Sequence, residues 1–101
     1  MEELLKEVRE EFARQRKQER KLLGEIADIT SVNFAEEAAE ALDSRKHLYG
    51  FETYLRMLED LRILLLEGIS ERTALESIQS GYRAEEILTM LRLDRRFLKR
   101  K

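Results

Sequence analysis

The chain has 101 residues, of which 43% are hydrophobic and 40% charged, and its formal net charge is −2. This hydrophobic content excludes a wholly disordered chain, and the length suits a single domain spanning 1–101. The absence of Cys excludes disulfides and thiolate metal sites. Because Pro is also absent and Gly numbers only four, few residues punctuate strands or loops, and the composition predicts an all-α protein.

Residues 1–29 predict one long helix, from about Glu2 to about Ile29, with heptad spacing. Its seam positions recur at alternating steps of three and four residues. They are Leu5, Val8, Phe12, Gln15, Glu19, Leu22, Ile26 and Ile29. Apolar residues stand at both ends of this series and the two polar ones in the middle. The favoured interpretation is a helix docked at both ends and solvated between them, and the alternative is a coiled-coil seam with polar layers.

A second helix is expected after the break at "DITSVNF". Thr30, Ser31 and Asn33 are all plausible N-caps, and Asn33 with Glu36 three residues later has capping-box spacing. The rest of the domain, residues 34–100, therefore begins there. Gly50 either kinks this second helix or ends it, and the residue pattern leaves both possibilities open.

The third segment, Phe51–Glu67, is apolar around most of its circumference, far beyond the stripe of a typical surface helix. Such a helix must be surrounded, and we expect a second chain to help cover it. The final helix, from Arg83 to about Leu98, has two apolar faces, which indicates a core contact plus an interface. The predicted core residues are Leu55, Leu58, Leu61, Leu65, Leu88 and Leu91, and the predicted interface residues are Met57, Leu64, Met90, Leu93 and Phe97. These features predict an oligomeric four- or five-helix bundle.

Residues 64–91 also fit a helix-turn-helix in two registers, with the turn at Gly68 or at Gly81. The second helix of such a motif places its N-terminal residues in the major groove of DNA. Carboxylates stand there in both registers: Glu71 and Glu76 in the first, Glu85 and Glu86 in the second. They face the negative field of the duplex. A dimeric helix-turn-helix regulator is therefore an alternative and not the preferred hypothesis.

Basic side chains gather in residues 14–21, "RQRKQERK", and in residues 92–101, "RLDRRFLKRK", whereas residues 25–43 are acidic. Clustered Lys and Arg suit contact with phosphates, so both segments are candidate nucleic-acid contacts. The candidates are Arg14, Arg16, Lys17, Arg20, Lys21, Arg92, Arg95, Arg96, Lys99 and Arg100. For the C-terminal segment the alternative is a solvated helix end whose cations suit the helix dipole.

The acidic stretch places Glu36, Glu40 and Asp43 on one helix face. Oxygen ligands at this spacing suit Mg²⁺. The run Glu36-Glu37-x-x-Glu40 is similar to one motif of the all-α nucleotide pyrophosphohydrolases of the MazG kind, and that resemblance implies Mg²⁺-dependent nucleotide hydrolysis. The family's second motif, Glu-x-x-Asp on a following helix, has no counterpart here. A solvated acidic face is therefore preferred.

The preferred hypothesis is a non-enzymatic helical assembly module without a cofactor, acting as a homodimer or small subunit within a nucleic-acid-handling complex. An adaptor with protein partners only is the structural alternative. The single histidine and the lack of a Gly-rich phosphate loop disfavour catalysis. No apolar run approaches the roughly 20 residues of a membrane span. The missing signal-peptide pattern favours the cytoplasm.

Overall fold

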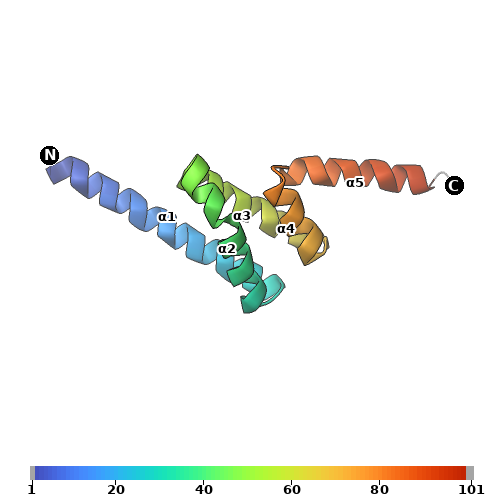
Figure 1. The fold of residues 1–101 in the computed structure, drawn as a ribbon, viewed down its shortest axis with the longest axis horizontal. Coiled ribbons are helices and arrows are strands. Elements are labelled where there is room, and N and C mark those ends of the chain that lie inside the picture. The colour runs from blue at the N-terminus through green and yellow to red at the C-terminus, as the bar shows by residue number, and fades with distance from the viewer. Residues whose placement is uncertain (1, 100–101) are drawn as a thin grey trace.

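The computed structural model describes the backbone of residues 2–99, and the side chains at positions 3–43 and 50–92. These residues are all-α, as the composition predicted. They form five helices: α1 (Glu2–Ile29), α2 (Val32–Tyr49), α3 (Phe51–Leu66), α4 (Glu71–Gln79) and α5 (Ala84–Lys99). The first and last helices extend toward opposite ends of the molecule, with α2, α3 and α4 packed between them (Figure 1).

The molecule is elongated. Its principal extents are 66 × 25 × 19 Å and its radius of gyration is 16.2 Å, whereas a compact domain of this length has a radius of about 13 Å. The difference arises because the N-terminal half of α1 and most of α5 project beyond the packed middle (Figure 1). Only the central part of the chain has the close helix packing expected for residues 34–100.

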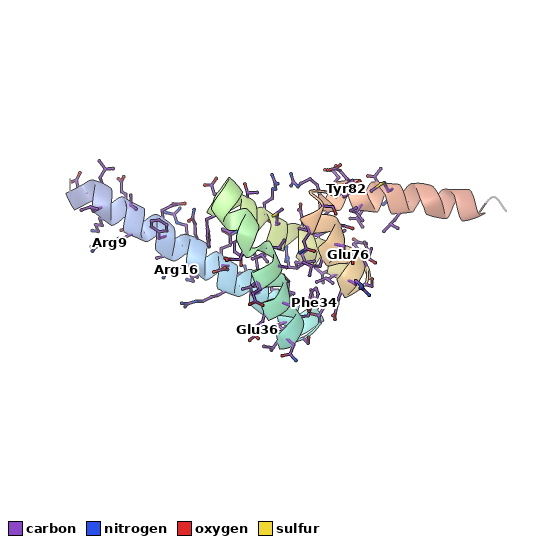
Figure 2. The ribbon with its side chains drawn as sticks, viewed as in Figure 1. Arg9, Arg16, Phe34, Glu36, Glu76 and Tyr82 are labelled. Carbon is purple, nitrogen blue, oxygen red and sulfur yellow. The ribbon has the colours of Figure 1, made fainter. Side chains whose placement is uncertain are left out.

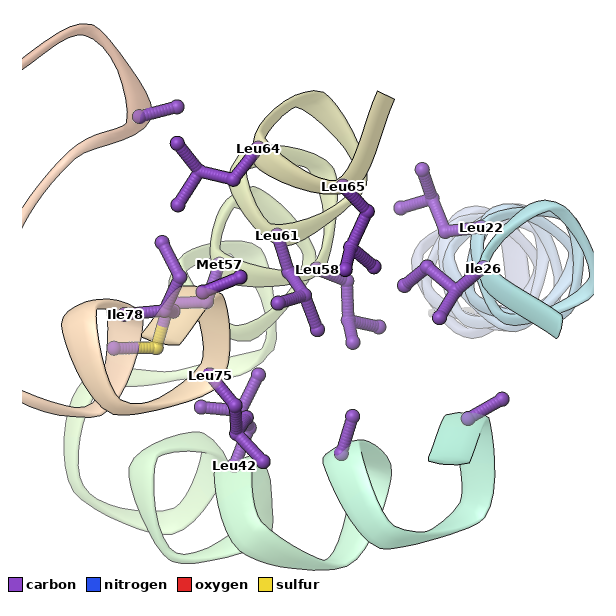
Figure 3. Packing of buried hydrophobic residues seen from close by; sticks show 14 of the residues in the cluster. Leu22, Ile26, Leu42, Met57, Leu58, Leu61, Leu64, Leu65, Leu75 and Ile78 are labelled. Carbon is purple, nitrogen blue, oxygen red and sulfur yellow. The ribbon is translucent and has the colours of Figure 1, made fainter. Parts of the chain in front are cut away.

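The central helix is α3, which contacts all four other helices. The predicted core residues on this helix are confirmed, since Leu55, Leu58, Leu61 and Leu65 are all buried. Figure 3 shows Leu61 and Leu58 packed between Leu22 and Ile26 of α1 on one side and the α4 side chains on the other. On α5, Leu88 is partly buried against this cluster, but Leu91 is 36% exposed, so its assignment to the core was wrong.

The wide apolar face of α3 is covered by the chain itself. Met57 and Leu64, which the sequence assigned to an interface, are buried in the intrachain core. Both are therefore removed from the candidate interface. A helical wheel shows how much of a helix must be covered, but it does not show which element covers it. The exception on α3 is Leu66, which is 63% exposed.

The boundary between α1 and α2 lies slightly earlier than expected. α2 begins at Val32, and Ser31 Oγ accepts a hydrogen bond from the Phe34 N–H at 3.0 Å, so Ser31 and not Asn33 provides the cap. Gly50, with φ of 90°, ends this helix. α2 and α3 are therefore two helices joined at one residue, which settles the alternative that the sequence left open.

Two glycines end helices where the sequence placed them. Gly68 has φ of 89°, and its N–H donates to the Leu65 carbonyl at 3.1 Å. Gly81, with φ of 93°, repeats the arrangement after α4 by donating to the Ile78 carbonyl at 3.0 Å. Both are left-handed C-terminal caps, a conformation that glycine adopts without a Cβ clash. Ser70 caps the first turn of α4.

Candidate functional site

The N-terminal half of α1 carries an apolar stripe that no other described helix covers. The exposed side chains are Leu4 (68%), Leu5 (59%), Val8 (44%) and Phe12 (58%). Further along the same face, after the polar residues Gln15 and Glu19, Leu22 and Ile26 are buried. Of the two ends that the sequence expected to dock, only the C-terminal one packs against the rest of the chain. Exposed apolar side chains in a contiguous stripe mark a surface for a partner.

The C-terminal half of α1 is fixed by packing and by one ion pair. Leu22 and Ile26 pack against α3, and Arg62 Nη1 donates to Glu25 Oε2 at 2.7 Å. Both charged side chains are about two-thirds buried, so this pair is less screened than a fully exposed one. α1 is thus anchored at one end, and its direction sets where the free half of the helix projects.

The basic segment 14–21 lies on the projecting helix, directly after the apolar stripe. Its five basic side chains, Arg14, Arg16, Lys17, Arg20 and Lys21, are all exposed. A surface hollow on this helix is lined by Arg9, Phe12, Ala13, Arg16, Lys17 and Arg20. Figure 2 shows Arg9 and Arg16 along the free part of α1. A phosphate could approach these cations without displacing another element of the described structure.

A second hollow lies where α1 meets the start of α3. It is lined by Phe12, Gln15, Arg16, Glu19, Arg20 and Phe51. The Phe51 ring packs against Tyr54, with centroids 5.5 Å apart and an interplanar angle of 55°. Burial of the phenol, and then its hydrogen bond to Glu19, raise the pKa of Tyr54. Glu19, a polar position of the predicted seam, is therefore occupied by a contact within the chain.

The C-terminal candidates are only partly described. Met90 is 44% exposed, which is compatible with its predicted place at an interface, and Arg92 is exposed. The remaining predicted residues of this segment lie outside the described side chains: Leu93, Arg95, Arg96, Phe97, Lys99 and Arg100. The assignment of the segment to a partner or to nucleic acid stays a prediction.

The cations near the possible helix-turn-helix are already engaged within the chain. Arg72 Nε lies 3.4 Å from Glu76 Oε1 on α4. At the start of α5, Arg83 Nε donates to Asp60 Oδ2 at 2.7 Å, and this hydrogen bond raises the pKa of Arg83. Glu86 accepts from the Arg83 N–H at 3.1 Å, which completes a capping contact. One carboxylate of each register, Glu76 in the first and Glu86 in the second, therefore makes a contact within its own helix.

Asp60 is a residue that the sequence reasoning missed. It is the one buried charged residue found among the described side chains, and it lies on the core side of α3. A buried carboxylate requires a partner, which Arg83 supplies across 23 positions of the chain. The run "LEDLRILLL" holds two adjacent acidic residues, Glu59 and Asp60, and only Asp60 is buried, so the sequence carried no clear signal that separates them.

Glu36, Glu40 and Asp43 line one shallow hollow together with Glu19 and Tyr54. The shared helix face predicted from the sequence is thus present, and Glu36 is on the outer side of α2 in Figure 2. Among the described residues, however, no group of three or more His, Cys, Asp or Glu is arranged to hold a metal ion. The three carboxylates share a face without converging on one point.

Comparison with known proteins found no match for this chain among protein-family models, curated proteins or solved structures. Function must therefore be inferred from the surfaces of the chain itself. The most distinctive of these is α1, whose free N-terminal half carries an uncovered apolar stripe and whose middle carries the exposed basic segment 14–21. No described helix is both long and apolar enough to pass through a membrane.

Proposed function

We propose that this chain is a non-enzymatic helical assembly module, working as a homodimer or small subunit within a nucleic-acid-handling complex. The observation that carries the proposal is the free half of α1, where four large apolar side chains remain exposed. A helix of this kind is marginal alone in water and is stabilised chiefly by packing its apolar face. A protein partner on this face supplies that packing.

The nucleic-acid part of the proposal is supported by the exposed basic segment 14–21 on the same helix. Lys and Arg side chains in such a row contact phosphates without reading base sequence. The hollow lined by Arg9, Phe12, Arg16 and Arg20 adds one aromatic ring among the cations. These side chains favour binding that is independent of sequence and sensitive to salt.

Sequence-specific reading by α4 or α5 is less well supported. The groove beside α4 is lined by three carboxylates, those of Glu37, Glu71 and Glu76, against one cation, Arg72. Because three carboxylates stand against one cation, a phosphate backbone meets a net negative surface at this position. The basic segment of α1 presents the opposite field.

Binding to labelled duplex and single-stranded DNA, measured at several salt concentrations, tests the nucleic-acid part. The variant Arg16→Ala with Arg20→Ala should weaken binding and lower the magnitude of the duplex salt slope by about 1.8, if each side chain contacts one phosphate. The matched control, Arg56→Ala with Arg72→Ala, removes the same charge from elsewhere on the surface. Equal losses in both variants would show that net charge, and not the α1 segment, drives binding.

The assembly part is tested by sedimentation equilibrium of the full chain over a wide range of concentrations. The expected result is a mass above 12.0 kDa that rises with concentration. A pure monomer in the presence and absence of nucleic acid contradicts self-assembly.

A further inference from the structure

Three arginines of α1 form a row on one side of the helix. At about 100° per residue, Arg9, Arg16 and Arg20 fall within an arc of about 40°, and the row extends over about 16 Å of the helix axis. All three line the first of the two hollows on α1, where Lys17 is a fourth cation and every charged lining residue is basic. Among the described side chains, none forms an ion pair with these four cations. The row is therefore available to an anionic ligand.

The opposite side of this part of α1 carries carboxylates. Glu7 and Glu11 lie about 160° from Arg9 around the helix. Arg14 is on their side, with Nη2 3.4 Å from Glu11 Oε2, and it lines neither hollow. A helix inserted in the major groove of a duplex has a phosphate backbone on each side, so these carboxylates would meet phosphate charge. A single strand follows one side of the helix and avoids them.

An exposed aromatic ring stands beside the arginine row. Phe12 is 58% exposed and lines both hollows of α1 together with Arg16 and Arg20. The second hollow also contains Phe51, whose ring is tilted against that of the buried Tyr54 at a centroid distance of 5.5 Å. Phe12 is thus shared by a hollow whose charged residues are all cations and a hollow with a second aromatic ring.

We propose that this face of α1 binds a single strand of nucleic acid, with a base stacked on Phe12 and the neighbouring phosphates on the arginine row. This binding mode rests on the proposed nucleic-acid function and specifies the form of nucleic acid that is bound. Bases in a duplex are stacked on their neighbours, whereas bases of a single strand have faces free for an aromatic ring. The phosphates follow the first hollow, because the second contains the carboxylate of Glu19.

Stacking on Phe12 leaves the rest of the apolar stripe for a protein partner. Leu4, Leu5 and Val8 are exposed and line neither hollow. Of the four stripe residues, Phe12 alone shares a hollow with the arginine row. The same helix therefore has separate surfaces for a protein and for a single strand.

The first test measures the fluorescence anisotropy of a labelled oligothymidylate at several salt concentrations. Phe12→Leu keeps an apolar side chain and favours the helix, but it removes the aromatic face. It should weaken binding at least about fivefold and leave the salt slope unchanged, since no charge is lost. Tyr82→Leu is the matched control, because Tyr82 is an exposed aromatic residue outside α1. Stacking is overturned if Phe12→Leu binds as tightly as the parent chain, or if Tyr82→Leu loses as much.

An abasic strand of the same length separates the base from the phosphates. It keeps the backbone charge of oligothymidylate but has no bases, so the parent chain should bind it at least about fivefold more weakly. Phe12→Leu should bind the two strands equally, because the ring that distinguishes them is gone. Equal binding of both strands by the parent chain overturns the stacked base. Oligouridylate repeats the comparison for RNA, and the tighter of the two base-bearing strands indicates whether DNA or RNA is the better ligand.

The arginine row is tested by two single substitutions on the same helix. If each arginine of the row contacts one phosphate, Arg9→Ala should lower the magnitude of the single-strand salt slope by about 0.7. Arg14→Ala removes the same charge from the opposite side of the helix and should leave the slope unchanged. Equal changes in the two variants overturn one-sided binding.

A duplex of the same length distinguishes this binding mode from the broader function. The single strand should bind more tightly than the duplex at the same salt concentration. A duplex that binds as tightly, with no dependence on Phe12, overturns the single-strand preference but leaves the proposed nucleic-acid function standing. Absence of binding to every probe overturns both.

Discussion

Truncation of Leu61 tests whether α3 is covered by the chain itself. Leu61 is fully buried, and Leu66 on the same helix is 63% exposed. Leu61→Ala removes about three methylene equivalents at about 0.8 kcal/mol each and leaves a cavity, so the expected loss is about 3 to 4 kcal/mol. Leu66→Ala makes the same chemical change on the surface, and its effect should stay within about 0.5 kcal/mol.

Urea unfolding followed by circular dichroism measures both values. With an m-value of about 1.5 kcal/mol/M, the Leu61 variant should unfold at about 2 M less urea than the parent chain. The two substitutions alter helix propensity equally, so their difference reports burial. Equal losses, or a Leu61 loss that shrinks as protein concentration rises, would refute coverage of α3 by the chain's own helices.

Two further predictions concern individual residues. Gly81→Ala should lower the free energy of unfolding by about 1 to 2 kcal/mol, because the φ of 93° at Gly81 is left-handed. Gly24→Ala, inside α1 with open space around it, should instead raise the free energy of unfolding by about 0.5 to 1 kcal/mol. Thermal unfolding of both variants measures these changes, and equal shifts would contradict a strained conformation for Ala at position 81. The raised pKa of Tyr54 means that its stabilising contribution is fully present below about pH 10 and is lost as pH rises above that value. Tyr54→Phe should therefore be less stable than the parent at pH 8, and the gap should narrow toward pH 11 in urea titrations. The control Tyr82→Phe, at a residue 46% exposed, should show a gap near zero at both values.

The sequence predicted the helices well because their signals are local. Periodic apolar residues are set by neighbours along the chain, so α1 and the core face of α3 were anticipated. The start of α2 was misplaced by two residues because Ser31, and not Asn33, caps the helix. Either side chain can accept a hydrogen bond from an unpaired backbone N–H in the first turn of a helix, so the residue pattern alone does not show which of the two is the cap.

The contacts between helices were predicted less well, because they depend on where each helix points. The sequence predicted that one domain could not bury Met57 and Leu64 as well as the core residues of α3. The chain nevertheless folds so that both side chains are buried. The heptad positions near Leu5 and those near Ile26 carry the same apolar signal, although only the latter reach another helix. The pair between Asp60 and Arg83 joins residues on separate helices, so periodicity gave no indication of it.

The elongated shape has a consequence for how this chain behaves in solution. A radius of gyration of 16.2 Å is close to the roughly 16.5 Å of a compact protein with about 200 residues. One extended monomer thus presents the hydrodynamic size of a globular pair of chains. Gel-filtration elution and the low-angle slope of X-ray scattering therefore overstate its mass. Light scattering or native mass spectrometry reports the number of chains directly.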